Sequence, residues 1–117
     1  MKKIQLSDSE LEIVRNVLRR MSIEFPVYAF GSRVRGAARK TSDLDLMIMT
    51  QEPLDLLRLA EIREAFENAE LAFKVDVLDR ASAEEHFKRL MDAEIEIIYL
   101  PKPSFKGYAP FSLRADR

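Results

Sequence analysis

One stretch of the sequence decides the fold: Val27-Tyr28-Ala29-Phe30-Gly31-Ser32, ten further residues, and then Asp43-Leu44-Asp45-Leu46-Met47-Ile48-Met49. The apolar runs on both sides are typical of strands, so we expect strands over 27–30 and 44–49 with a Gly-Ser turn after the first. Residues two apart in a strand point to the same side, so Asp43 and Asp45 project together while Leu44 faces the core. The second strand therefore opens with two adjacent carboxylates.

This pair of carboxylates favours a bound cation. Two acidic groups held side by side repel each other unless positive charge lies between them. Mg²⁺ prefers oxygen ligands and commonly binds through one or two carboxylates together with substrate phosphates. Gly31 allows the backbone to approach a ligand closely, and Ser32 offers a hydroxyl and a backbone N–H to a phosphate. The combination predicts phosphate chemistry assisted by a metal ion.

A third carboxylate, Asp76, lies between Val75 and Val77 in an otherwise apolar strand predicted over 73–79. The helix predicted over 54–69 has the length of a crossover that brings this strand beside the one carrying Asp43 and Asp45. We therefore expect the three acids to converge. Three acids can hold two divalent ions about 3.5–4 Å apart, which clamp the attacking and leaving oxygens of an in-line displacement. Asp76 would also help to deprotonate an incoming hydroxyl.

The remaining elements alternate between helix and strand. A capping box of Ser7 and Glu10 predicts a helix to about Met21. Glu52-Pro53 precedes the helix over 54–69, whose apolar side is predicted to hold Leu54, Leu57, Ile62, Ala65 and Phe66. We also expect a short helix or loop over 33–40, a helix from an N-cap at Ser82 to about Met91, and a strand over 94–100. This order indicates an α/β (α+β) fold with a small mixed sheet flanked by helices.

Length and composition limit the possible classes. A chain of 117 residues fits one domain, which we expect over 1–100, followed by an irregular tail over 101–117 that is either disordered or docks onto a partner. The sequence has no cysteine, no apolar run of the ~20 residues needed to span a bilayer, and polar residues after Met1-Lys2-Lys3, so we expect a cytoplasmic protein. A net charge of −1 argues against nucleic acid as a direct partner.

These motifs resemble those of the nucleotidyltransferases of the DNA polymerase β superfamily, in their minimal form. The family signature is Gly-Ser, roughly ten residues, Asp-x-Asp, and a third acid on a later strand. Here it reads Gly31-Ser32, Asp43-Leu44-Asp45 and Asp76. The resemblance spans approximately 11–100 and implies a polymerase-β-like fold.

The resemblance also implies an activity and a set of roles. The expected reaction is the Mg²⁺-dependent transfer of AMP from ATP to a hydroxyl, with release of pyrophosphate. Gly31 and Ser32 would hold the triphosphate, Asp43 and Asp45 would bind both metal ions, and Asp76 would complete one metal site. Arg33 and Arg35 are candidates for contact with the triphosphate, the alternative being a solvated basic face.

Minimal members of the family often pair with a small helical HEPN-type ribonuclease toxin, which implies that this chain is an antitoxin that adenylylates a tyrosine of its toxin. Two alternatives stay open at this point. The chain could neutralise its partner by contact alone, or it could be a small-molecule or nucleic-acid nucleotidyltransferase that needs a second subunit.

Overall fold

The structure is a computed structural model that describes residues 4–85, 88–89 and 94–102. Its elements follow the predicted alternation: α1 (Asp8–Arg20), β1 (Val27–Phe30), α2 (Ser32–Arg35), β2 (Leu44–Ile48), α3 (Leu56–Glu67), β3 (Val75–Asp79), the 3₁₀ helix η1 (Arg80–Ser82) and β4 (Ile95–Tyr99). In this described part of the chain, no helix is long and apolar enough to cross a membrane. The expected tail from residue 103 onward lies outside the described residues.

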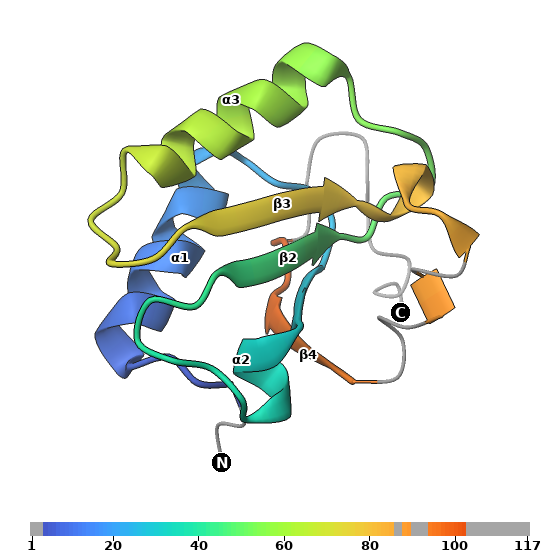
Figure 1. Cartoon of the computed structure of the whole chain (residues 1–117). Coiled ribbons are helices and arrows are strands. Elements are labelled where there is room, and N and C mark those ends of the chain that lie inside the picture. Colours follow the sequence, from blue (N-terminus) through green and yellow to red (C-terminus); the bar gives the residue numbers. More distant parts are fainter. Residues whose placement is uncertain (1–3, 86–87, 90–93, 103–117) are drawn as a thin grey trace, which may run out of the picture.

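The four strands form one mixed sheet in the order β3-β2-β1-β4 (Figure 1). Strand β2 pairs in parallel with β3, and β1 pairs antiparallel with both β2 and β4. The parallel pair is connected through α3, as a crossover requires. The predicted α/β fold with a small mixed sheet is therefore confirmed.

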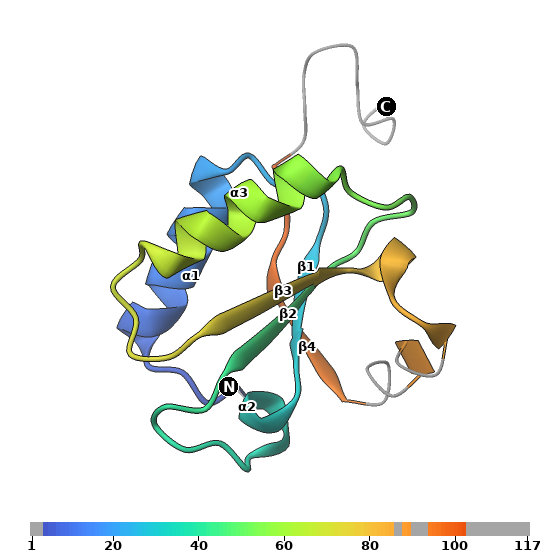
Figure 2. The same cartoon turned by 45° about the horizontal axis from the view of Figure 1, so that its top comes forward.

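Helices α1 and α3 both pack on one face of the sheet (Figures 1 and 2). Leu44, Leu46 and Ile48 of β2 point toward them, as the period of a strand requires. These three residues join α1 and α3 in one buried cluster, which also includes Val14, Val17, Leu18, Val27, Ala29, Ile62, Phe66 and Val77. The alternate residues of β2, including Asp45, consequently point to the opposite face of the sheet.

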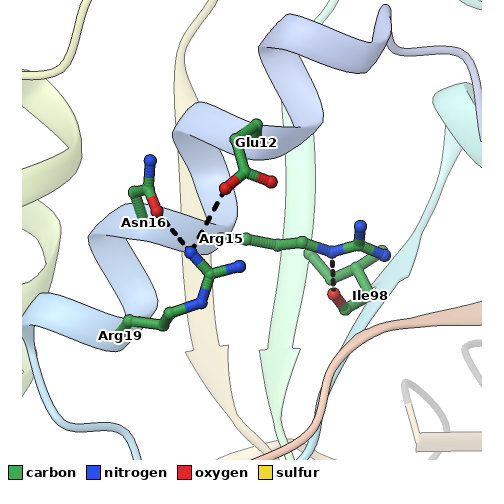
Figure 3. A network of polar contacts seen from close by, with 5 residues as sticks. All are labelled: Glu12, Arg15, Asn16, Arg19 and Ile98. Carbon is green, nitrogen blue, oxygen red and sulfur yellow. Dashed lines mark hydrogen bonds and ion pairs between the residues drawn. The ribbon is translucent and has the colours of Figure 1, made fainter.

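The start of α1 is as predicted. The Ser7 hydroxyl accepts a hydrogen bond from the Glu10 N–H at 3.0 Å, and Glu10 Oε1 accepts one from the Ser7 N–H at 2.9 Å. A cap of this kind stabilises a helix by about 1 kcal/mol. Further along α1, Arg15 Nε donates to the Ile98 carbonyl of β4 at 2.7 Å, and Arg19 contacts Glu12 and Asn16 (Figure 3).

Two local predictions were wrong. Leu57 of α3 was expected to face the core but is 66% exposed, and Leu59 is buried in its place. Ser82 was expected to cap a helix, but it ends η1 and its hydroxyl donates to Asp79 Oδ2 at 3.0 Å. After Ser82, the next helical hydrogen bond among the described residues runs from the Lys88 N–H to the Glu84 carbonyl. The expected helix therefore begins after Ser82. Its later residues lie partly outside the described ranges.

Candidate active site

The Gly-Ser turn lies where β1 ends, next to the acid-bearing strand β2. Gly31 has φ +86° and ψ −157°, a conformation that residues with a side chain rarely adopt. A Cβ atom on Gly31 would lie 2.3 Å from Asp45 Oδ2. Glycine is therefore required at this position both by its backbone conformation and by the space that the Asp45 carboxylate occupies.

The carboxylates of Asp45 and Asp76 come from neighbouring parallel strands. The two residues are partners in the register of β2 and β3, which places their side chains on the same face of the sheet. Phe30, the residue before Gly31, is the partner of Asp45 on the other side. The crossover argument thus describes the observed arrangement of Asp45 and Asp76.

The surroundings of Asp45 change its acidity. The pKa of Asp45 is raised from 3.8 to about 6. The largest cause is partial burial, followed by the charge of Asp76 and then by the charge of Asp43. Arg35 acts in the opposite direction. Asp43 precedes β2 and is exposed, and its charge still acts on Asp45. The charges of Asp43 and Asp76 therefore both act on Asp45.

Two other predicted site residues, Ser32 and Arg35, lie on α2, which directly follows Gly31. Ser32 begins the short helix α2 and is partly exposed. Arg35 ends the same helix, is exposed, and favours the ionised form of Asp45. Both side chains remain accessible to a ligand on this side of the sheet.

Arg33 has a different environment from the one expected. Its side chain is only 4% exposed. The guanidinium donates hydrogen bonds to the backbone carbonyls of Gln5, Arg39, Lys40 and Ser42. Because this charge is buried and four of its five N–H donors are used in these bonds, the prediction that Arg33 contacts a triphosphate is corrected. No local pattern in the sequence points to Gln5, which lies far from Arg33 along the chain.

A cavity of about 770 Å³ runs along β3 and includes Asp45 and Asp76 in its wall. Sequence reasoning missed two cations there, Arg63 and Lys74. Arg63 of α3 donates from Nη2 to the Val77 carbonyl at 2.8 Å. Val77 lies on the outermost strand of the sheet, so this contact satisfies a carbonyl at the sheet edge. The spacing of residues along α3 does not indicate that Arg63 contacts a strand, so the sequence alone could not reveal this contact.

The family model for the polymerase β nucleotidyltransferase domain matches residues 12–103 of this chain. This match includes the Gly-Ser turn and all three acids. The chain belongs to this nucleotidyltransferase family.

Curated relatives of this nucleotidyltransferase are similar over most of their length. The probable protein adenylyltransferase MntA of Haemophilus influenzae is 42% identical over 89 residues, which cover 76% of this chain and 78% of the relative. A protein of Methanocaldococcus jannaschii, also named as a protein adenylyltransferase, is 30% identical over 92 residues, covering 76% of this chain and 92% of the relative.

Solved structures show the same fold. A toxin–antitoxin crystal structure with AMP-PNP superposes with a TM-score of 0.65 at 20% identity, covering 79% of this nucleotidyltransferase and 74% of that chain. A complex of the tri-AMPylated HEPN toxin of Shewanella oneidensis with its MNT antitoxin gives a TM-score of 0.56 at 20% identity, covering 77% and 72% of the two chains. At these identities the likeness concerns the fold alone.

The donor set of the site suits a divalent cation. Asp45 and Asp76 are register partners on neighbouring strands, and burial, followed by the charges of Asp76 and Asp43, raises the pKa of Asp45. Oxygen ligands without histidine or cysteine are the set that Mg²⁺ prefers. In the part of the chain that the structure describes, no three of these side chains already stand in a metal-binding arrangement. A cation would therefore have to draw the carboxylates together as it binds.

Proposed function

We propose that this nucleotidyltransferase moves AMP from ATP to a tyrosine hydroxyl of a cognate HEPN-type toxin and thereby acts as an antitoxin. The observation that carries the proposal is the pairing of Asp45 with Asp76 beside Gly31, with the charge of Asp43 also acting on Asp45. The names of the curated relatives support a protein acceptor. The solved complexes with AMP-PNP and with an AMPylated HEPN toxin support ATP and the toxin as partners.

In this reaction the acceptor oxygen attacks the α-phosphorus of ATP. The new bond joins this oxygen to phosphorus, the bond between the α-phosphorus and the bridging oxygen breaks, and pyrophosphate leaves. Gly31 and Ser32 would hold the triphosphate through the backbone N–H and hydroxyl of Ser32. Asp76 would accept a hydrogen bond from the acceptor hydroxyl and favour loss of its proton, while Arg35 would balance negative charge on the phosphates.

Asp43 and Asp45, completed by Asp76, would hold two Mg²⁺ ions, which when bound neutralise the triphosphate and favour in-line displacement. Ionised carboxylates are needed for this role, so the raised pKa of Asp45 matters for the pH range of activity. ATP and Mg²⁺ are abundant in the cytoplasm, and we propose that location for the protein.

Recognition of the acceptor is proposed to use surface outside this cluster. The side chains of Leu56 and Leu57 at the start of α3 are 82% and 66% exposed. Adjacent exposed apolar side chains form the kind of contiguous patch that can serve as a contact site for a partner. The domain limits of 1–100, with 101–117 as a tail that takes part in docking, stay a prediction.

The proposal is tested by co-expression with the protein encoded by the adjacent reading frame, followed by intact-mass measurement of that protein. We expect a mass increase in units of AMP, and no increase with the Asp43→Asn/Asp45→Asn double variant. Glu24→Gln is the control, because it removes an exposed carboxylate that does not shift the pKa of Asp45 and lies outside the start of α3. A partner that stays unmodified but is still neutralised by the double variant would favour the contact-only antitoxin.

A further inference from the structure

Arg33 directly follows the Gly31-Ser32 turn, and its buried guanidinium has an unusual set of partners. Nε donates to the Ser42 carbonyl at 3.0 Å and Nη1 donates to the Gln5 carbonyl at 2.6 Å. Nη2 donates to the Lys40 carbonyl at 2.9 Å and more weakly to that of Arg39 at 3.3 Å. All four acceptors are backbone carbonyls, so the side chain holds main chain in place.

Three of these carbonyls belong to the loop over 39–42, which leads directly into Asp43. The same loop is closed on itself by the Arg39 N–H, which donates to Ser42 Oγ at 2.8 Å, and by the Ser42 N–H, which donates to the Arg39 carbonyl at 3.1 Å. A residue beside the proposed phosphate turn thus fixes the path of the chain into the first metal-binding acid.

The segment before α1 completes this arrangement. The Gln5 N–H donates to the Arg33 carbonyl at 2.8 Å, and Gln5 Oε1 accepts from the Ala38 N–H at 3.0 Å. Gln5 therefore contacts both Arg33 and the start of the same loop. The four contacts of the guanidinium are part of one connected network.

The central carbon of the Arg33 guanidinium also lies over the ring of Phe73, 4.1 Å from the ring centroid. Phe73 is buried and precedes β3, the strand that carries Asp76. The next residue, Lys74, accepts at its carbonyl a hydrogen bond from the Leu44 N–H of β2 at 2.9 Å. Arg33 thus contacts the entries of both acid-bearing strands.

We infer that Arg33 is a positioning residue that sets the separation between the Gly31-Ser32 turn and the strands of Asp43, Asp45 and Asp76, without touching the nucleotide. The planar guanidinium is needed because it reaches four carbonyls in different directions and stacks on a ring, which a lysine ammonium cannot do. This role in catalysis rests on the proposed function, whereas the ordering of the loop does not.

Arg15 provides a matched control. It is also a partly buried arginine that donates to a backbone carbonyl, that of Ile98 at 2.7 Å, but it connects α1 to β4 (Figure 3). Replacing Arg15 removes one contact of the same kind, between an arginine and a backbone carbonyl, at a distance from the loop over 39–42. A general loss of stability can therefore be separated from a loss of position in the site.

The test compares Arg33→Lys and Arg33→Gln with Arg15→Lys and Arg15→Gln. Amide hydrogen exchange over 38–44 is measured without ligand, and the KM for ATP and kcat are measured for AMP transfer to the co-purified partner. We expect both Arg33 variants to exchange these amides at least tenfold faster and to raise the KM for ATP at least tenfold. Both Arg15 variants should melt at lower temperature with unchanged exchange over 38–44 and unchanged KM.

Three results would overturn the inference. The first is an Arg33→Lys variant with normal exchange and KM, and the second is an equal rise in KM for the Arg15 variants. The third is failure of both Arg33 variants to fold while the Arg15 variants fold, because Arg33 would then serve the fold as a whole. If the native protein transfers no AMP, the proposed function fails, and the exchange measurement alone still decides whether Arg33 orders the loop.

Discussion

The backbone of Gly31 leaves room for the carboxylate of Asp45, since a Cβ on Gly31 would lie only 2.3 Å from Asp45 Oδ2. The turn and the acid-bearing strand are therefore packed against each other at the point where phosphate and metal are proposed to meet. The need for glycine at position 31 is therefore tied to the position of the Asp45 carboxylate.

Gly31→Ala tests this relationship. We expect it to lower the free energy of unfolding by about 2–4 kcal/mol, because backbone strain adds to the displacement of Asp45, and to abolish AMP transfer. The matched control is Gly36→Ala, because Gly36 also has a positive φ of +81° but no atom within 4 Å of an added Cβ. That variant should lose only about 1 kcal/mol and keep its activity. Equal losses of activity in the two variants would contradict the role of the Gly31–Asp45 contact.

The raised pKa of Asp45 predicts that this residue changes the free energy of unfolding of the ligand-free protein in a pH-dependent manner. The folded state holds this proton more tightly than the unfolded state, so the contribution of Asp45 to stability falls as the pH rises from about 3.8 to about 6. We expect Asp45→Asn to be more stable than the native chain by roughly 1 kcal/mol at pH 8, after allowance for solvent screening of a half-buried group. The difference should vanish near pH 4.

Chemical denaturation of the two proteins at several pH values measures this difference directly. Taking the difference removes the contributions of the acids that do not interact with Asp45, because those acids titrate alike in both proteins. A constant difference between pH 4 and pH 8 would show that Asp45 has an ordinary pKa.

The neighbours of Asp45 should change its pKa in a definite order. Burial is the largest cause of the rise, followed by the charges of Asp76 and Asp43, while Arg35 lowers the pKa. NMR titration of the Asp45 carboxyl should therefore show a larger fall in pKa for Asp76→Asn than for Asp43→Asn, and a rise for Arg35→Gln. An unchanged value in Asp76→Asn would place that carboxylate too far away for the proposed mechanism.

Local patterns predicted much of the fold and the arrangement of the acids. Strand parity determines which side Asp45 faces, and the length of the crossover determines that β3 lies beside β2. Both depend on spacing along the chain, which the sequence displays directly. The capping box at Ser7 is local in the same sense, because its two partners are three residues apart.

The environment of Arg33 could not be predicted in this way. Its main partners outside the loop are Gln5 and Phe73, which are distant from it in the sequence and contact it only in the folded protein. A basic residue beside a phosphate motif favours a phosphate contact, and only tertiary packing shows that its charge is buried. The error at Leu57 is similar, because the phase of a short apolar pattern was ambiguous between Leu57 and Leu59.

Binding of Mg²⁺ with AMP-PNP should stabilise the protein in a pH-dependent manner. A ligand that binds only the folded state raises the melting temperature, and these carboxylates must be ionised to hold a metal ion. Because the pKa of Asp45 is about 6, the apparent affinity should be constant above pH 7 and fall up to tenfold per pH unit below pH 6. The stabilisation at pH 8 should therefore exceed that at pH 5, the reverse of the trend for the protein without ligand.

Asp45→Asn should show little stabilisation at either pH, whereas Asp55→Asn should match the native chain. Sodium chloride at equal ionic strength is the control for screening. Equal shifts at pH 5 and pH 8, or a normal shift in Asp45→Asn, would mean that the ion is held elsewhere.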